Sequence, residues 1–140
     1  QINDTHGHSV GDDVLVALAR LVEGSLRGCD RLGRWGGEEF IVLATHSDVD
    51  AAMGLAERLR SLVAELSIAG LEQSITVSIG VATATARAEH TVPIPQSLVF
   101  AADVALYKAK RAGRNRVSAT YPETADRAAR ERVGLPPAVQ

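Results

Sequence analysis

The sequence predicts one mixed α/β (α+β) domain. Three observations favour this class: apolar residues recur at helical spacing in three segments, one segment alternates with the period of a strand, and a glycine-rich turn precedes another apolar run. A chain of 140 residues with 46% hydrophobic residues is long and apolar enough to bury a single core.

Composition argues against several classes of protein. The net charge of −2 does not fit a generally basic surface for nucleic acid. The single cysteine, Cys29, allows neither a disulfide within the chain nor a cysteine-based zinc site, and it fits a reducing compartment. No segment approaches the roughly 20 apolar residues of a membrane span, and no signal-peptide pattern opens the chain. We therefore expect a cytoplasmic location, with membrane anchoring through a preceding region left open.

Residues 1–12 form a polar segment rich in turn formers. Such a loop often only connects elements, but Asn3, His8 and Asp12 can also read the hydrogen-bonding edge of a base. His6 and His8 could pair as metal ligands, yet no third ligand is evident, so zinc is not predicted.

The first helix is predicted to start at Val10 and to end at Gly28, a residue that tolerates positive φ. Ser9 and Asp12 resemble a capping box, and the acidic Asp12 and Asp13 suit the positive end of the helix dipole. The apolar face comprises Val14, Leu15, Leu18, Leu21, Val22 and Leu26.

Three arginines, Arg27, Arg31 and Arg34, follow within eight residues. A cluster of this kind can simply be solvated. Arginine also grips phosphate through two parallel hydrogen bonds and stacks on purines, so an anion or nucleotide site is the more specific hypothesis.

A hairpin tip is predicted at Gly36 and Gly37, ahead of the apolar strand 41–44. Glycines let a phosphate approach the main chain, and the carboxylates of Glu38 and Glu39 offer hard oxygen ligands to a divalent cation. Taken alone, the same residues also fit an ordinary turn with a solvated acidic rim.

A second helix is predicted after Asp48 or Asp50, either of which can cap it. Arg58 and Arg60 lie off its apolar face and are expected to be solvated. That face comprises Ala52, Leu55, Ala56, Leu59, Leu62, Val63 and Leu66.

Residues 75–81 alternate as a strand buried on one face, and residues 84–96 are predicted to form a loop. A third helix is then closed by Gly113, and residues 114–117 are predicted as a last strand. The apolar face of this helix comprises Leu98, Ala102, Ala105, Leu106 and Ala109.

The end of the third helix carries the one strongly basic stretch of the sequence. Basic residues at a helix end can merely complement the helix dipole, or they can grip a polyphosphate. The domain is predicted over residues 1–118, followed by a polar tail over 119–140 that is partly helical or disordered. The basic residues are Lys108, Lys110, Arg111, Arg114 and Arg116.

Four motifs occur in a fixed order over residues 1–118. They read Ile-Asn-Asp-x-x-Gly-His-x-x-Gly-Asp, Arg-x-Gly-Gly-Glu-Glu-Phe, Thr-Val-Ser-Ile-Gly-Val-Ala and Ala-Asp-x-Ala-Leu-Tyr-x-Ala-Lys-x-x-Gly-Arg-Asn. Together they resemble the GGDEF domain, the diguanylate cyclase family. The resemblance implies a palm-like, nucleotidyl-cyclase-type sheet flanked by helices.

The resemblance also implies an activity. The family joins two GTP molecules into cyclic di-GMP and releases pyrophosphate, with Mg²⁺ or Mn²⁺ offsetting phosphate charge. Because each domain holds one GTP, a homodimer is implied, and a sensory domain is expected upstream. Glu38 resembles the catalytic and metal-binding position, and Glu39 the other acidic metal position. The residues similar to those that bind substrate are Asn3, His8, Asp12, Leu15, Gly36, Gly37, Lys110 and Arg114.

Arg27 and Asp30 fall at the position of the family's inhibitory site for cyclic di-GMP, and Arg58 at a secondary position of that site. The resemblance therefore implies product inhibition. A second hypothesis, an inactive module that binds cyclic di-GMP or GTP, uses the same residues.

The family pattern begins earlier than this chain. Its first helix and strand, which ends in Asp-x-Asp-x-Phe-Lys, would precede Gln1 and supply a second carboxylate to the metal. Glu38 alone is a poor site for Mg²⁺, which prefers six oxygen ligands. We therefore expect little or no cyclase activity from these 140 residues alone.

Overall fold

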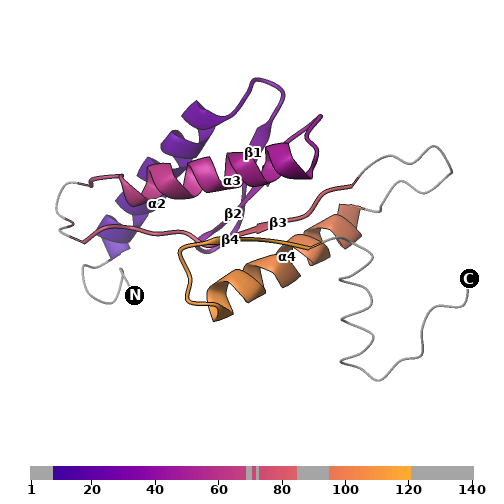
Figure 1. The fold of residues 1–140 in the computed structure, drawn as a ribbon. Coiled ribbons are helices and arrows are strands. Elements are labelled where there is room, and N and C mark those ends of the chain that lie inside the picture. The colour runs from indigo at the N-terminus through magenta and orange to yellow at the C-terminus, as the bar shows by residue number, and fades with distance from the viewer. Residues whose placement is uncertain (1–7, 69–70, 72, 85–94, 121–140) are drawn as a thin grey trace, which may run out of the picture. The chain divides into compact units, whose positions relative to one another are not determined.

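Three helices and two small sheets make up the part of the chain that the structure describes (Figure 1). This computed structural model describes residues 8–68, 71, 73–84 and 95–120. The described parts of Gln1–His46 and Ser61–Thr76 form one compact unit, and those of Ser47–Arg60 and Val77–Gln140 form another. The mixed α/β class is confirmed.

Helix α2 (His8–Ser25) buries the apolar face that its periodicity predicts. Val14, Leu18 and Val22, spaced four residues apart, are buried, and Leu15 is half-buried beside them. Residues at this spacing lie on one side of a helix, so burial of that side accounts for the stability of α2.

Both predicted ends of α2 were wrong. Ser9 is no N-cap, because the helix already begins at His8, and the first turn consequently contains no acidic residue. Gly28 does not end the helix, and it is not among the described residues with positive φ. The helix ends at Ser25, whose hydroxyl donates to the Leu21 carbonyl at 2.8 Å.

Strands β1 (Arg31–Gly36) and β2 (Glu39–Leu43) form the predicted antiparallel hairpin. Gly36 pairs with Glu39 and Arg34 with Phe40, so Trp35 is an extra residue in β1 and bulges out of the ladder. A two-residue turn therefore joins the strands. Trp35 is 63% exposed.

Helix α3 (Val49–Ala64) confirms the second predicted helix. Asp48 is its cap, since Asp48 Oδ1 accepts from the Ala51 amide at 2.8 Å, whereas Asp50 lies inside the first turn. Ala56, Leu59 and Val63 of the predicted face are buried.

Strands β3 (Ile79–Val81) and β4 (Val117–Ala119) pair in parallel, and α4 (Pro95–Arg111) packs against both. The strand predicted over 75–81 is therefore shorter, because β4 supplies partners to only three residues. The last strand begins at Val117 rather than Arg114. Among described residues, no ladder joins this sheet to the hairpin.

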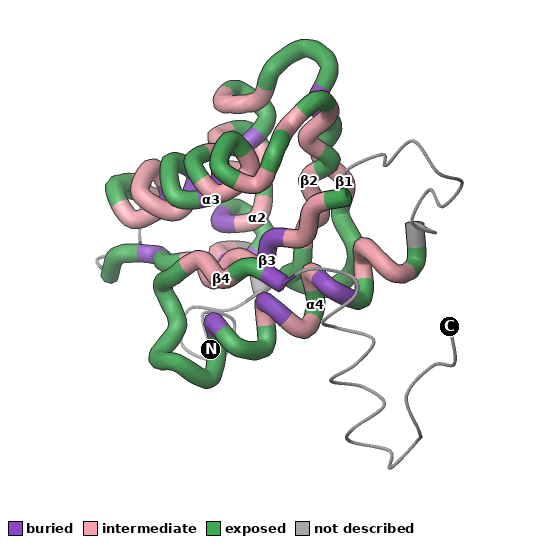
Figure 2. Tube along the Cα trace, turned by 45° about the vertical axis from the view of Figure 1, so that its right-hand side comes forward, coloured by how far each residue is buried: buried purple, intermediate pink, exposed green. Residues whose placement is uncertain are grey.

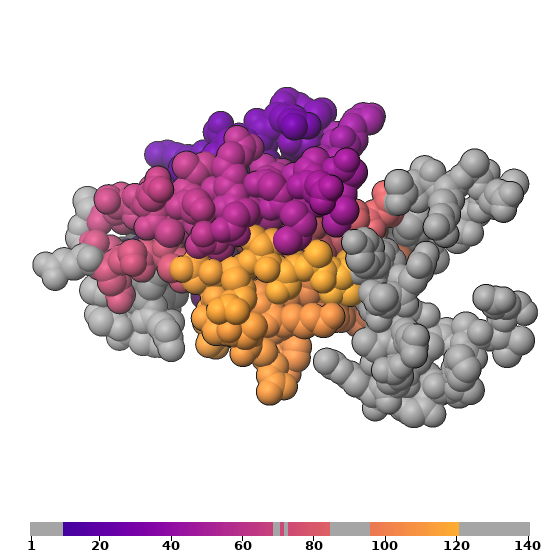
Figure 3. All heavy atoms as spheres, in the orientation of Figure 1, coloured from indigo at the N-terminus to yellow at the C-terminus, as the bar shows by residue number. Residues whose placement is uncertain are grey.

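Close contact between α4 and β3 forms the core of the second unit. A Cβ added to Gly80 would overlap the Ala102 carbonyl oxygen and the Leu106 amide nitrogen. The helix backbone thus rests directly on the strand. Ala101, Ala105 and Ala109 are fully buried. Figure 2 shows buried residues in β3 and along α4, and Figure 3 shows α4 and β4 in contact.

Both ends of α4 follow simple sequence rules. The helix begins at Pro95, and proline suits the first turn of a helix. It therefore includes the end of the predicted loop 84–96. Residues 85–94 of that loop lie outside the described part. Gly113 closes the helix as predicted, with φ of 114°. The Arg114 amide donates to the Ala109 carbonyl at 3.1 Å, as in a Schellman end.

The predicted domain boundary after residue 118 stays a prediction, because residues 121–140 lie outside the described part. Strand β4 continues through Ala119, and the Thr120 amide donates to the Val81 carbonyl at 2.9 Å. Among the described helices, none has the length and apolar character needed to cross a membrane.

We expect Gly80→Ala to lower the free energy of unfolding by at least about 1–3 kcal/mol, because the new methyl group would overlap backbone atoms of α4. Gly54→Ala in α3 is the control. Nothing lies within 4 Å of its added Cβ, so the variant should gain about 0.5–1 kcal/mol in urea unfolding. Unchanged stability of Gly80→Ala would contradict this packing.

Candidate nucleotide site

The turn of the β1–β2 hairpin presents bare backbone to its surroundings. Gly37 has a φ of 51°, a left-handed conformation that glycine adopts without strain. Gly36 has no such requirement, and a Cβ added to it would meet nothing within 4 Å. The fold therefore does not need glycine at residue 36, and a ligand that approaches the main chain is a physical reason for it.

Arg34 fixes the conformation of this turn. Its Nε and Nη2 donate to the Gly37 carbonyl oxygen at 3.1 and 2.7 Å. Arg31 likewise donates from Nη1 to the carbonyls of Gly28 and Asp30, at 2.7 Å each. Two of the three clustered arginines thus bind carbonyl groups of nearby backbone.

Glu38 and Glu39 are exposed carboxylates at the tip of the hairpin. Within the described residues, the Glu38 side chain has no hydrogen bond or ion pair, so its oxygens are available to a ligand. Carboxylate oxygens are the donors that Mg²⁺ prefers. Among the described residues, no three His, Cys, Asp or Glu side chains lie together so that they could hold a metal ion. These two residues fit part of a hard-cation site.

The predicted guanine-binding residues lie at the start of α2. Asp12 is exposed and Leu15 half-buried, and their spacing of three places them on neighbouring positions of the helix surface. Asn3 lies outside the described residues, as does the side chain of His8.

Lys110 and Arg114 are both exposed at the end of α4. Lys110 is in the last turn, whereas Arg114 lies beyond the helix with a φ of 59°. The two residues therefore do not form a helical i, i+4 pair, because α4 ends at Arg111. Left-handed residues outside glycine are strained, so this conformation must be held by its surroundings.

Asp30 has a structural role that the sequence did not reveal. The side chain is buried, with a relative exposure of 7%. Its Oδ2 accepts from the Arg27 amide at 3.1 Å, and its Oδ1 accepts from the Thr45 amide at 3.2 Å and weakly from the Cys29 thiol. The carboxylate thus ties the start of β1 to the end of β2. Two main-chain amides use this carboxylate, and its predicted role in the inhibitory site stays a prediction.

Arg27 and Arg58, the other two predicted inhibitory-site residues, are exposed. The Arg27 guanidinium makes no hydrogen bond or ion pair to any described residue, so it is available to a phosphate. Arg58 lies on α3 and has interactions of its own.

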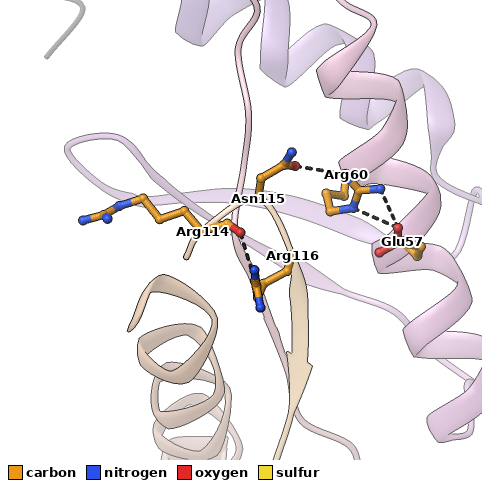
Figure 4. A network of polar contacts seen from close by, with 5 residues as sticks. All are labelled: Glu57, Arg60, Arg114, Asn115 and Arg116. Carbon is orange, nitrogen blue, oxygen red and sulfur yellow. Dashed lines mark hydrogen bonds and ion pairs between the residues drawn. The ribbon is translucent and has the colours of Figure 1, made fainter. Parts of the chain in front are cut away.

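Arg60 was predicted to be merely solvated, and this was wrong. Its guanidinium pairs with Glu57 and also donates to the side chain of Asn115, 55 residues away (Figure 4). The hydrogen bond from Arg60 lowers the pKa of Glu57 from its ordinary value, so the carboxylate stays ionised. A contact this distant in sequence leaves no local signal.

Comparison with known proteins identifies relatives of this chain. The family model described as "Diguanylate cyclase, GGDEF domain" matches residues 1–116. Diguanylate cyclase DgcM of Escherichia coli K12 is 50% identical over 118 residues, which cover 84% of this chain and 27% of that protein. Diguanylate cyclase A of Treponema denticola is 44% identical over 119 residues, 84% of this chain and 31% of the relative. The chain thus spans under a third of these relatives.

Solved structures agree with these matches. The active GGEEF domain of a diguanylate cyclase from Vibrio cholerae superposes with a TM-score of 0.77 and 37% identity, covering 85% of this chain and 74% of that one. The GGDEF domain of DgcB from Caulobacter crescentus, in complex with c-di-GMP, gives a TM-score of 0.74 and 32% identity, covering 84% of this chain and 69% of that one.

We expect Asp30→Ala to lower the free energy of unfolding by about 1–3 kcal/mol, because the amides of Arg27 and Thr45 lose their acceptor in a buried place. Arg27→Ala, which removes an exposed side chain, should stay within about 0.5 kcal/mol in the same urea titration. Equal stability of the two variants would disprove the structural role of Asp30.

Proposed function

The chain belongs to the GGDEF family of diguanylate cyclase domains, and on this premise we propose that it condenses two GTP molecules into cyclic di-GMP. The observation that carries the proposal is the hairpin turn. It combines a glycine that the fold does not need at residue 36 with an unpaired, exposed carboxylate at residue 38 among the described residues. Backbone open to a phosphate beside a free carboxylate suits phosphoryl transfer.

In the proposed reaction, the 3′-hydroxyl oxygen of each GTP attacks the α-phosphorus of the other. The bond between the α-phosphorus and its bridging oxygen breaks, and two pyrophosphates leave. Glu38 takes the hydroxyl proton as general base. Gly36 and Gly37 allow the phosphates to approach the main chain. The exposed Lys110 and Arg114 bind the terminal phosphates, Lys110 as a point charge and Arg114 through its planar fork.

Guanine is assigned to the start of α2. Asn3 and Asp12 hydrogen-bond the base in this proposal, His8 supports them, and Leu15 contributes apolar surface. Glu38 and Glu39 would hold a divalent cation, either Mg²⁺ or Mn²⁺, which when bound neutralises charge on the phosphates.

Several features of the natural protein belong to the same proposal. Because one domain holds one GTP, catalysis requires a homodimer, and a sensory domain is expected to control it. The structure of the relative SiaD from Pseudomonas aeruginosa contains its activator SiaC. We propose a cytoplasmic location and no nucleic-acid partner. The expectation that the 140 residues alone turn over little GTP stays a prediction.

Product inhibition is proposed at the turn that Asp30 stabilises. The c-di-GMP complex of the Caulobacter crescentus GGDEF domain supports cyclic di-GMP as a ligand of this family. Arg27 offers an exposed guanidinium to the product's phosphates, and Asp30 holds the turn from which that side chain projects. Arg58 is the secondary arginine of this proposed site.

The alternative function is a binding module for cyclic di-GMP or GTP without turnover. The exposed Arg27 suits this alternative equally, because product binding requires no chemistry at the hairpin. Formation of cyclic di-GMP by the natural protein separates the two functions.

We expect Glu38→Gln to lower the rate of cyclic di-GMP formation by about 10²-fold or more, because the amide cannot accept the hydroxyl proton. Gly36→Ala should weaken GTP binding. Product is measured by chromatography after adding GTP and Mg²⁺ to the natural protein.

Both hairpin variants should keep the free energy of unfolding of the wild type within about 0.5 kcal/mol. A Cβ added to Gly36 meets nothing within 4 Å, and the Glu38 side chain has no hydrogen bond or ion pair to a described residue. Wild-type rates in Glu38→Gln, at unchanged stability, would rule out a catalytic Glu38.

We expect Arg27→Ala to raise the concentration of cyclic di-GMP that halves activity by about tenfold or more, because a charge-assisted phosphate contact is lost. The initial rate without product should not change. Arg20→Ala, an exposed arginine on α2, is the matched control. Inhibition that is equally strong in Arg27→Ala would place the product site elsewhere.

A further inference from the structure

Three successive residues after α4 have positive φ. The values are 114° for Gly113, 59° for Arg114 and 45° for Asn115. Glycine accepts this conformation and asparagine tolerates it, but it is strained for arginine. The strained residue is the one assigned to the terminal phosphates of GTP, so the groups that hold it there are of functional interest.

One of these groups is the Arg60 side chain of α3. Arg60 Nη1 donates to Asn115 Oδ1 at 2.9 Å, and Arg60 Nε and Nη2 donate to Glu57 Oε1 at 2.8 and 2.6 Å. Glu57 lies one turn before Arg60 and keeps its guanidinium in place. The side chain of Arg60 is only 20% exposed, so this contact is partly shielded from water.

A second group holds the same segment from the other side. Arg116 Nε donates to the Arg114 carbonyl oxygen at 3.1 Å. Figure 4 shows Asn115 turned toward Arg60 and the Arg114 guanidinium turned the opposite way, clear of the network. Hydrogen bonds thus hold Asn115 and the Arg114 carbonyl, while the Arg114 guanidinium points away from them.

We propose that Arg60, with Glu57 and Asn115, is a positioning residue that presents Arg114 to the terminal phosphates of GTP. The proposal rests on the function proposed above. It adds Glu57 and Arg60, which lie outside the four motifs, and gives a role to Asn115, the last residue of the fourth. Arg60 does not touch the nucleotide. Because Glu57 pairs with its charge, Arg60 contributes a directed hydrogen bond rather than a free cation for phosphate.

The experiment is a mutant cycle on the natural protein, with 3′-deoxy-GTP as probe. This nucleotide keeps the triphosphate but lacks the attacking hydroxyl, so it is bound without being consumed. Its Kd is measured by calorimetry for the wild type, Arg60→Ala, Arg114→Ala and the double variant. Non-additivity reports that two residues act through one contact.

We expect Arg60→Ala to raise this Kd about 5- to 10-fold, which corresponds to the loss of one hydrogen bond. In the Arg114→Ala background, the same substitution should change the Kd less than about twofold. A merely structural residue would have equal effects in both backgrounds, and that result would overturn the proposal.

Asn115→Gly is the second variant, because glycine keeps the left-handed backbone but removes the acceptor of Arg60. Its Kd should rise as in Arg60→Ala. Arg20→Ala removes the same charge from α2 and should leave the Kd unchanged. Thermal unfolding of each variant confirms that binding is measured on folded protein.

The remaining outcomes distinguish failure of the positioning role of Arg60 from failure of the proposed function. If Arg114→Ala weakens binding but Arg60→Ala and Asn115→Gly do not, the positioning role is overturned and the proposed function stands. If the wild type does not bind 3′-deoxy-GTP at all, the proposed function is overturned, and the positioning role with it.

Discussion

The approach of α4 to Gly80 is the contact on which the second unit depends. A helix can lie this close to a strand only where the strand has no side chain, and backbone atoms of Ala102 and Leu106 lie next to Gly80. The position of α4 on β3 is thereby fixed. The end of α4 follows from it, with Lys110 in the last turn and Arg114 just beyond the Schellman end at Gly113.

The sequence predicted the features that depend on local pattern. The three helical faces, the hairpin, the Asp48 cap and the glycine end of α4 all follow from spacing or from the preference of one residue type. Predictions failed where a distant partner decides. Strand β3 is short because β4 pairs with only three of its residues. The packing role of Gly80 depends on contact with α4, which begins at Pro95.

Polar residues show the same limit. The sequence does not reveal that Asp30 is buried and connects two strands, because its partner Thr45 lies 15 residues away in the chain. Arg60 is predicted from the sequence to be a solvated helix residue. In the structure it donates a hydrogen bond to Asn115, which is 55 residues away in the chain. The motifs identified the family correctly. Only the contacts separate residues that hold the fold from residues that remain available to a ligand.

The central proposal is that the open turn at Gly36 and the carboxylate of Glu38, which is unpaired among the described residues, serve the condensation of GTP. The most direct measurement is the product stoichiometry of the natural protein incubated with GTP and Mg²⁺. The account predicts one cyclic di-GMP and two pyrophosphates for every two GTP consumed. GTP that is bound but not converted, or that yields pyrophosphate without cyclic di-GMP, would contradict it.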